Sequence, residues 1–580
     1  MSSTVKRAPD TKEQLGKPEQ VRDEKNLGAA QDDHANRMRD DDQTVFPNKR
    51  ALTVTTIALC LIVFFFALVR NRKGSLQTIT DMILTSQDGT IITTAIPRIT
   101  ADFNTVRDVG WYGSAYLMVM TAFQPFFGRL FSIFPLRPVY IAAIGIFSLG
   151  SLICAVSPSS PVFILGRAVA GLGGAGIFTG SLLIIAASVP LRLRPAFFGG
   201  IGAVAGVATI SGPLLGGAFT DRVTWRWCFY INLPVSAVPV ATLLLFYKPP
   251  DRGHRQKLSL LQTLRALLLP DTALLVASTV SLFLALKWGG SEYPWNSGRV
   301  IALLVVFALL LLAFLFVQYL RGKDGFLPLA MFKQRTVAFG AWFIFCLSSA
   351  LFTMSYFVPF WFQAVKGTSA EQSGISTLPL IVGLSLCEFL GGALITAIGY
   401  YSPMLYLSSV LMAVGAGLAS TLRPSSGHSH WIGYLAVFGI GAGLGNQVPQ
   451  MALQVVLPAD ELAVGTGFLS FAQSFGGALF TSVGQNLLSN FLVQNLAELA
   501  PNLDPREVID AGATGFRRVV PKDDVAAVVL SYNEALTVTY RAAAVMGALT
   551  IIGALGVEWK SVKTKKKNEQ EQNSAQVESS

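Results

Sequence analysis

Residues 206–219 read GVATISGPLLGGAF, a stretch without charged side chains that lies inside the apolar run 195–219. A run of about 25 residues extends about 38 Å as an α-helix, more than the roughly 30 Å hydrocarbon core of a bilayer. Small residues let helices approach closely in lipid, and a proline bends its helix by removing a backbone hydrogen bond. The stretch therefore predicts a tightly packed membrane-spanning helix whose packing residues are Gly206, Gly212, Pro213, Gly216 and Gly217.

Apolar runs of this kind recur along the whole chain. Hydrophobic residues make up 52% of the 580 residues and charged residues 14%, whereas soluble domains carry about 25% charged residues. This composition excludes a soluble multidomain protein and predicts an all-α polytopic membrane protein. Fourteen runs qualify as spans: 51–69, 110–131, 138–157, 161–187, 195–219, 227–247, 272–288, 299–319, 336–362, 373–398, 403–420, 431–456, 463–492 and 537–558.

The basic residues predict the orientation of these spans. An even number of spans places both termini on the same side of the membrane. Basic residues gather in the connections 248–270 and 320–335 and in the C-terminal tail, which all lie on the side of the N-terminus. Because basic connections stay in the cytoplasm, both termini are expected to be cytoplasmic. The net charge of +11 is thereby explained without nucleic acid as a partner.

The same pattern predicts the domain organisation. We expect a disordered N-terminal tail, an N-terminal six-helix bundle, two extra helices with cytoplasmic loops, a C-terminal six-helix bundle with a long external loop, and a basic and then polar cytoplasmic tail. The corresponding ranges are 1–47, 48–247, 248–335, 336–558 with the loop at 493–535, and 559–580.

Residues 69–87 interrupt the first span. They place three basic residues directly after an apolar run and lack helical apolar periodicity. Joining Leu68 to Asp88 would restore one long span. The codons of Val69 and Gln87 can supply the GT start and the AG end of an intron. We interpret 69–87 as a retained-intron insert, and the alternative is a genuine insertion that breaks the span.

Three charged residues inside apolar runs are candidates for proton coupling: Asp88, Arg167 and Glu388. An arginine at mid-span costs about 2.5–3.5 kcal/mol, so Arg167 is expected to face the interior beside carbonyls or a carboxylate. The alternative is an arginine that extends to the membrane surface. A buried carboxyl group holds a proton until water reaches it, which is the chemistry of a proton-coupled transporter. For Glu388 a structural role is equally compatible with the sequence.

Polar amides in the spans are candidates for the lining of a transport cavity. They are Gln124, Gln363, Gln447, Gln450 and Gln473. An amide inside a membrane protein either bonds a substrate or connects two helices, and the sequence leaves both roles open.

Several classes of function lack support. The five cysteines lie in apolar runs without CxxC spacing, and two of the four histidines lie in a Ser/Gly-rich segment, so neither a metal site nor a disulfide framework is expected. The chain contains no GxSxG, P-loop or HExxH motif. We therefore expect no enzymatic activity, no catalytic residues and no cofactor.

Several motifs resemble a known family. Leu68 with residues 88–99 gives LDGTIITTAIPRI, and 128–138 reads GRLFSIFPLRP, which keeps Gly128, Arg129 and Arg137 of a cytoplasmic gate loop but has Ser132 in place of an acid. The stretch 206–219 resembles the antiporter motif. Together with WRWCFYINLP at 225–234, these motifs resemble the fourteen-span drug:proton antiporters of the major facilitator superfamily, and in particular the fungal toxin-efflux type.

The resemblance implies two pseudo-symmetric six-helix bundles joined by two linking helices. In agreement, 210–220 and 472–481 share a paired glycine, an alanine and a Phe-Thr ending, and such repeats move around a central site. The family implies export of small organic compounds by alternating access, driven by the proton gradient, with Asp88 as a coupling residue. It also implies a monomer in the plasma membrane whose partners are its substrate, protons and lipid.

Other functions stay open at this point. Similar proteins transport basic amino acids into the vacuole or carry siderophores, and the interrupted first span is also compatible with a non-transporting receptor or an inactive paralogue. The substrate is not specified by the sequence, because helix periodicity alone does not tell which side chains line a cavity.

Overall fold

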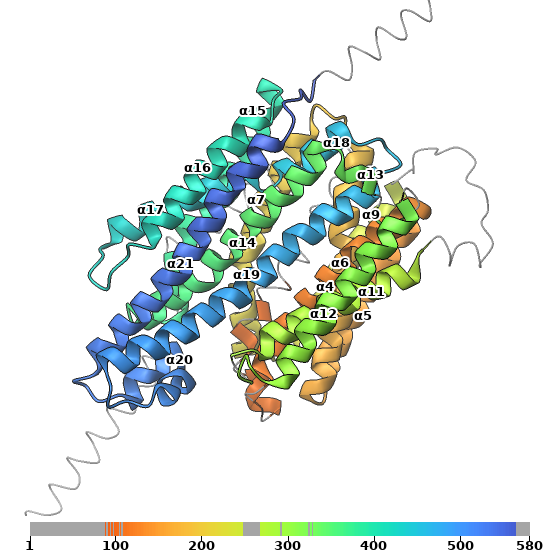
Figure 1. Ribbon diagram of the computed structural model, residues 1–580. Coiled ribbons are helices and arrows are strands. Elements are labelled where there is room, and N and C mark those ends of the chain that lie inside the picture. The colour runs from red at the N-terminus through yellow and green to blue at the C-terminus, as the bar shows by residue number, and fades with distance from the viewer. Residues whose placement is uncertain are drawn as a thin grey trace, which may run out of the picture. The chain divides into compact units, whose positions relative to one another are not determined.

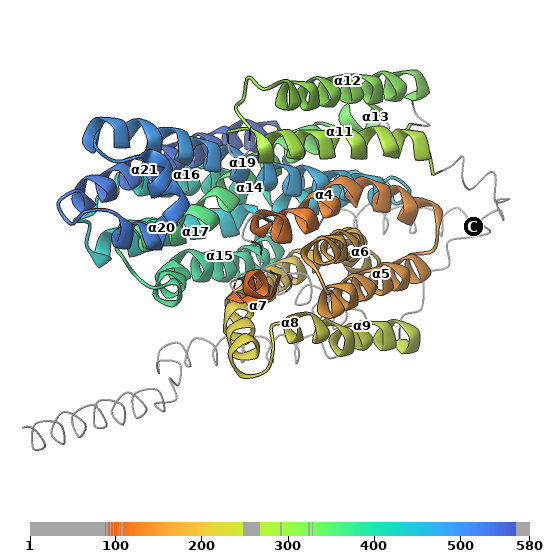
Figure 2. The ribbon, with the colours of Figure 1, turned by 90° about the horizontal axis from the view of Figure 1, so that it is seen from below.

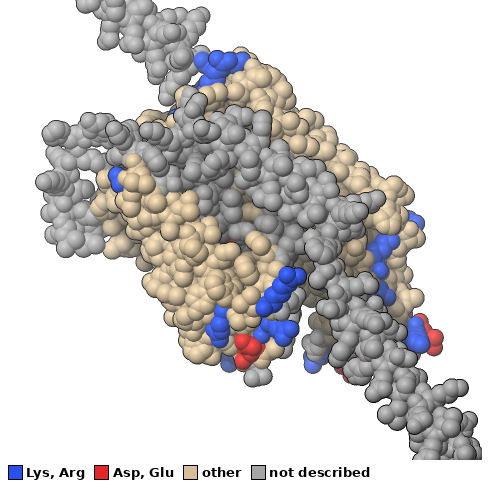
Figure 3. Space-filling model, turned by 180° about the vertical axis from the view of Figure 1, so that it is seen from behind, with Lys and Arg blue, Asp and Glu red and all other residues tan. Residues whose placement is uncertain are grey.

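The computed structural model describes residues 88–246 and 267–563, apart from 89–90, 93, 97, 104, 106–107, 291–292, 323–324 and 328. The N-terminal tail 1–47, the run 51–69, the proposed insert 69–87 and most of the C-terminal tail lie outside these residues. The described part is helical (Figure 1), with short connections and two isolated β-bridges. Uncharged residues dominate its visible surface (Figure 3), as expected in contact with lipid.

The helices form three groups along the chain. The N-terminal group contains the helical residues of 88–103 followed by α4 to α9: α4 (Val109–Ile133), α5 (Leu136–Val156), α6 (Ser160–Ser188), α7 (Arg194–Arg222), α8 (Trp227–Tyr230) and α9 (Asn232–Phe246). The hairpin group contains α11 (Leu269–Trp288), α12 (Gly298–Arg321) and the short α13 (Leu329–Phe332).

The C-terminal group contains six helices of 18 residues or more, one helix of nine residues, and one polar helix of 15 residues between the last two long helices. These are α14 (Arg335–Ala364), α15 (Ala370–Ile398), α16 (Ser402–Ala419), α17 (His428–Gly445), α18 (Val448–Val456), α19 (Leu462–Leu499), α20 (Pro505–Val519) and α21 (Val525–Gly556).

The predicted count of fourteen spans is not confirmed. Within the described residues, ten helices are long and apolar enough to cross a membrane. Three further predicted runs correspond to α4, α7 and the pair α17–α18, and the fourth, 51–69, lies outside the described residues. The glycine, proline and polar residues that suit helix packing lower the apolar character of α4 and α7.

Two predicted boundaries are wrong. The run 431–456 is two helices, because α17 ends at Gly445 and α18 begins at Val448. The region 493–535, which we expected to form a loop, is largely helical: α19 continues to Leu499, α20 follows, and α21 begins at Val525. In α20, which is kinked at Gly512, Val508 and Phe516 are buried, and their polar neighbours conceal them from a hydropathy count.

The two large groups meet along two pairs of helices, α4 with α19 and α7 with α15. A Cβ added at Gly128 of α4 would lie 2.9 Å from the Ala463 carbonyl oxygen of α19. On the other side, a Cβ added at Gly392 of α15 would overlap the Pro195 carbonyl of α7. Only glycine permits backbones to approach this closely.

These close approaches lie toward one end of the helices. At this end the chain turns from α4 to α5, from α6 to α7, from α15 to α16 and from α18 to α19. We call it the closed end, and the opposite end the far end. Figure 1 shows α18 at the closed end and α20 at the far end of the C-terminal group. At the far end of α7, Gly217 faces open space.

The hairpin group packs against both large groups. In Figure 2, α11 lies between α12 and α4, and the Lys287 ammonium lies 5.9 Å from the Trp111 ring centre of α4. Phe283 of α11 contacts Phe475 of α19, with ring centres 5.8 Å apart. In the outer helix α12, only 11% of the most apolar segment is buried inside the protein, as expected for a helix surrounded by lipid.

Candidate functional site

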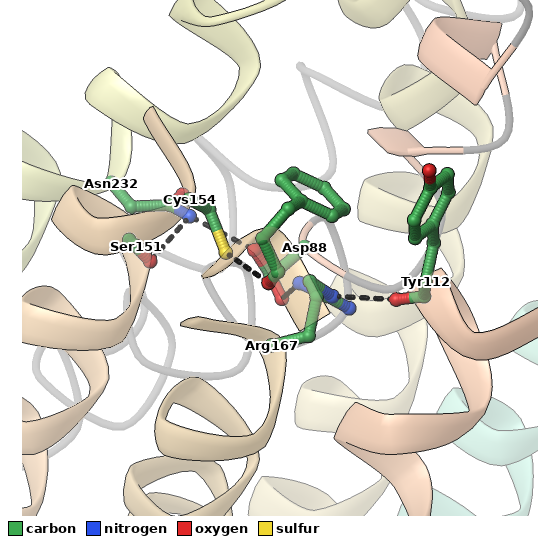
Figure 4. A network of polar contacts seen from close by, with 7 residues as sticks. Asp88, Tyr112, Ser151, Cys154, Arg167 and Asn232 are labelled. Atoms are coloured by element: carbon green, nitrogen blue, oxygen red, sulfur yellow. Dashed lines mark hydrogen bonds and ion pairs between the residues drawn. The ribbon is translucent and has the colours of Figure 1, made fainter. Parts of the chain in front are cut away.

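A buried ion pair joins two of the predicted residues in the N-terminal group. The Arg167 Nη1 atom of α6 donates to the Asp88 Oδ2 atom at 2.6 Å. The side chains are 1% and 0% exposed, so the alternative of an arginine that extends to the membrane surface is wrong. Burying two charges in lipid is costly unless each is paired and hydrogen-bonded. Both conditions are met here (Figure 4).

Neighbouring groups form further hydrogen bonds with this ion pair. Asn232 at the start of α9 donates to the other carboxylate oxygen of Asp88 at 3.0 Å and is also 3.2 Å from the Ser151 hydroxyl of α5. The Arg167 Nε atom donates to the Tyr112 carbonyl of α4 at 2.9 Å. The guanidinium also lies 4.6 Å from the Tyr116 ring centre. Several helices thus converge on one charge pair.

Asn232, Tyr112 and Ser151 were not predicted as site residues. Asn232 lies in the quoted motif WRWCFYINLP, and an amide at the start of an apolar run was a usable signal. The Tyr112 contribution is a backbone carbonyl, which no side-chain pattern reveals. A contact of this kind requires only that two helices cross at that point.

A second polar cluster surrounds Glu388 in the C-terminal group. Asn446, at the break between α17 and α18, donates from its Nδ2 atom to the Glu388 carboxylate at 2.5 Å. Gln473 of α19 donates to the Asn446 side-chain oxygen at 3.2 Å. Glu388 is 4% exposed, and no basic side chain lies within ion-pair distance of it among the described residues. The carboxyl group therefore relies on neutral donors.

The Glu388 carboxylate also lies at the boundary between the two large groups. A Cβ added at Gly202 of α7 would overlap this carboxylate, and one added at Gly199 would overlap the Glu388 carbonyl. The Glu388 side chain therefore packs directly against the backbone of α7, where glycines provide no side chain. Any change in the hydration or charge of this group acts directly on the α7–α15 contact.

The antiporter-motif residues divide between two neighbours of α7. Gly206 packs against the Ser385 hydroxyl of α15, and Gly216 packs against Ile91 and Thr94 of the first helical segment. Gly212 is buried, Gly217 faces open space, and Pro213 lies within α7. The motif thus lets α7 contact a partner in each large group.

The residues of the predicted gate loop take part in two separate contacts. Gly128 forms the close approach of α4 to Ala463 and Gly467 of α19. Arg137 at the start of α5 donates to the Leu244 carbonyl near the end of α9 at 2.9 Å. Arg129 is partly buried near the end of α4. Gly128 therefore belongs to the boundary between the groups, whereas Arg137 stabilises the N-terminal group itself.

The five glutamines have different surroundings. Gln124 and Gln450 are buried and retain unpaired polar atoms: both side-chain atoms of Gln124 and the Oε1 atom of Gln450. Gln450 donates to the Ser470 hydroxyl at 3.4 Å, and Gln363 donates to Ser373 at 3.0 Å. Gln447 and Gln473 are partly buried. Gln473, through Asn446, is the one that the structure connects to Glu388.

Comparisons with known proteins agree with this architecture. The Major Facilitator Superfamily model matches residues 82–481. The MFS-type efflux pump MFS1 of Arthroderma benhamiae is 48% identical over 489 residues, which are 84% of this chain and 90% of that protein. The efflux pump aflT of Aspergillus parasiticus is 44% identical over 477 residues, 82% of this chain and 93% of that protein.

A solved structure shows the same fold at low sequence identity. The proton:xylose symporter XylE matches with a TM-score of 0.53 and 15% identity, over 85% of this chain and 96% of that one. At this identity the likeness concerns the fold alone. The family match over residues 82–481 and the 48% identity to MFS1 show that this multi-pass membrane protein belongs to the major facilitator superfamily.

Proposed function

We propose that this chain is a secondary transporter that exports small organic compounds, such as toxins and other secondary metabolites, in exchange for protons. The observation that carries the proposal is the buried Glu388 carboxyl group, held by the neutral Asn446 amide on the boundary with α7. Relatives that align over most of their length are named as efflux pumps, including MFS1 and aflT. These names favour export over the vacuolar, siderophore and receptor alternatives.

In this proposal Glu388 is the group that binds and releases the transported proton. A carboxyl group with a neutral amide donor can exist in either protonation state without leaving a buried cation unpaired. Protonation removes a charge from the α7–α15 boundary and favours close packing there. Deprotonation favours entry of water between the helices, so the proton and the conformation are linked.

Asp88 and Arg167 have a different part in this scheme. Their charges compensate each other, and both oxygens of Asp88 already accept hydrogen bonds. The pair stabilises the packing of α4, α6 and α9 around the first span and makes the N-terminal group move as one unit. Proton coupling at Asp88 requires that Arg167 first leaves it, so Asp88 is the second of the two coupling carboxylates in our scheme.

The remaining features of the proposal concern the membrane. We propose fourteen spans in two six-helix bundles with two linking helices, both termini in the cytoplasm, and a monomer in the plasma membrane. At the closed end, Arg192 lies in the connection between α6 and α7, and Arg137 and Arg194 lie in the first turns of α5 and α7. Basic residues at helix ends and connections favour the cytoplasmic side. The arrangement in the structure would then be the conformation that is closed toward the cytoplasm.

Transport by proteoliposomes tests the proposal. The full-length protein is reconstituted with pyranine inside as a pH indicator, and rhodamine 6G, Nile red and ethidium are used as probes of an apolar cavity. We expect dye movement that depends on a pH gradient, with proton movement in the opposite direction. Transport of these dyes that persists after nigericin and valinomycin collapse the gradient would contradict antiport, and an absence of any dye movement would contradict export of apolar compounds.

The Glu388→Gln variant tests the assigned residue. It keeps an oxygen that accepts the Asn446 hydrogen bond but cannot ionise. We expect the initial rate of dye-coupled proton movement to fall at least tenfold and to lose its dependence on pH. Glu498→Gln, which removes an exposed carboxylate at the far end of α19, is the matched control and is expected to keep normal transport. Equal proton movement in both variants would remove Glu388 from the coupling role.

A further inference from the structure

Arg194 lies at the closed end, where α6 ends and α7 begins. Its Nε atom donates to the Val189 carbonyl at 2.8 Å, and its Nη2 atom donates to the Ala186 carbonyl. Both carbonyls belong to the last turn of α6 and its C-cap, which leave carbonyl groups without helical partners. Two of the three guanidinium nitrogens are therefore fixed to the N-terminal group itself.

The third nitrogen reaches the other large group. The Arg194 Nη1 atom donates to the Oε1 atom of Gln454 in α18 at 3.0 Å. Gln454 is 4% exposed, so its oxygen is shielded from water in this arrangement. Because the guanidinium is anchored by α6, the hydrogen bond to Gln454 is formed only when α18 lies against the start of α7.

Close backbone contacts surround this hydrogen bond. The next residue, Pro195, presents its carbonyl to Gly392 of α15. The other pair of helices is α4 and α19, and Ala463 lies near the start of α19, shortly after α18. A Cβ added at Gly128 of α4 would lie 2.9 Å from the Ala463 carbonyl oxygen. Any separation of the two groups at this end must therefore break the Arg194–Gln454 bond as well.

We propose that Arg194 and Gln454 form a latch that favours closure of this end and must release before the end opens. The bond joins a charged donor to a neutral acceptor, a type that is stronger than a bond between two neutral groups but lacks the strength of a buried ion pair. On opening, Arg194 keeps both bonds to α6, and water replaces Gln454 for one nitrogen only. The latch thus biases the conformational equilibrium without locking it, and Arg194 is a positioning residue.

Thiol labelling of the full-length protein in nanodiscs measures this equilibrium. Ala463→Cys reports opening of the closed end, since Ala463 is buried where α19 meets α4. Gly217→Cys reports the far end, where the position faces open space. A water-soluble maleimide is the probe, and its reaction with protein lacking either introduced cysteine gives the background from native thiols.

Two substitutions at Gln454 are expected to act in opposite directions. Gln454→Leu removes the acceptor, and we expect about tenfold faster labelling of the thiol introduced by Ala463→Cys, equivalent to about 1.4 kcal/mol, with slower labelling in Gly217→Cys. Gln454→Glu places a carboxylate opposite Arg194, and we expect slower labelling in Ala463→Cys together with reduced transport of any dye. Arg192→Gln, which replaces an exposed arginine of the same connection, is the matched control and is expected to leave both labelling rates unchanged.

A double variant separates the latch from general loss of packing. If the bond carries the effect, Arg194→Gln combined with Gln454→Leu will label the closed-end thiol no faster than the faster of the two single variants. Additive effects would overturn the proposal, as would an unchanged labelling rate in Gln454→Leu at normal thermal stability. If Gln454→Leu does not fold, the direction of the Gln454→Glu effect decides: faster labelling of the closed-end thiol would contradict the latch. These labelling outcomes do not depend on the substrate or on proton coupling.

Discussion

The two large groups each bury a carboxylate, and they stabilise it in different ways. In the N-terminal group, Asp88 is paired with Arg167 and also accepts a hydrogen bond from Asn232. In the C-terminal group, Glu388 has an amide donor, Asn446, and faces bare backbone of α7. The charge of a carboxylate beside a buried cation is compensated, whereas a carboxylate held by an amide has no compensating charge. In the proposed scheme this difference makes Glu388 the first coupling carboxylate and Asp88, which must first lose Arg167, the second.

The largest expected effect comes from breaking the N-terminal pair. Arg167→Leu leaves Asp88 as a buried charge with only the Asn232 amide, and removal of one partner of a buried pair costs about 3–5 kcal/mol. We expect a large decrease in folded protein, measured as monodisperse protein on size-exclusion chromatography and as the midpoint of thermal unfolding in detergent.

The control for this variant removes both charges. Asp88→Asn combined with Arg167→Leu is expected to recover part of the stability, because no uncompensated charge then remains. If the double variant is as unstable as Arg167→Leu, the loss comes from packing of the arginine side chain, and the proposed contrast with Glu388 loses its basis.

A smaller effect is expected in the C-terminal cluster. Asn446→Leu keeps a similar volume but removes the donor to Glu388 and the acceptor of Gln473. Leaving such buried groups unpaired costs about 1–3 kcal/mol. We expect a moderate fall in the midpoint of thermal unfolding, measured as for Arg167→Leu.

Neutralising Glu388 should reduce this loss. In the Glu388→Gln background, Asn446→Leu removes a hydrogen bond to an uncharged amide at position 388. A neutral group is less costly to leave unpaired than an ionised one. The cost of Asn446→Leu should therefore be smaller in that background. An equal cost in both backgrounds would mean that the amide does not act on the carboxylate.

The smallest effect is expected in the hairpin group, which contains a third buried carboxylate. Asp271 accepts a hydrogen bond from Gln318 at 2.8 Å and lies 3.1 Å from the Arg321 guanidinium, which is 38% exposed. Asp271→Asn retains an acceptor for Gln318, and the exposed arginine is solvated by water. We expect the free energy of unfolding to fall by less than about 1 kcal/mol, measured as a small decrease in the midpoint of thermal unfolding. A loss as large as that of Arg167→Leu would show that exposure of the cation does not control the cost.

Much of the fold was predictable because composition and run length report directly on the solvent around a helix. The membrane class and ten of the spans followed from apolar runs of sufficient length, and the family followed from the resemblance of the motifs. The boundaries that failed are those where hydropathy is a poor guide. Asn446 and Gln447 break 431–456 without changing its average apolar character. In α20, Val508 and Phe516 are buried although charged residues surround them in the sequence.

The site residues were predictable only in part. Arg167 and Glu388 were recognised from the sequence because a charged residue in an apolar run is costly and therefore rare. Both side chains are buried, as we predicted. Among their partners, Asn232 had a usable signal, whereas Tyr112 contributes a carbonyl and Asn446 lies in a helix break, and neither was predictable. The Arg194–Gln454 bond joins residues 260 positions apart, and one sequence contains no signal for such a pair. The proton-coupling roles themselves remain predictions.

The hairpin α11–α12 makes the two flanks of the protein mechanically unequal. On one flank, Lys287 and Phe283 of α11 contact Trp111 of α4 and Phe475 of α19. The helix α11 therefore connects the two large groups where α4 meets α19. On the other flank, α7 and α15 meet through small residues. Within the part of the chain that the structure describes, the hairpin group makes no extensive contact with this second flank. Movement of the two groups is therefore expected to be larger, and to disturb neighbouring lipids more, on the α7–α15 side.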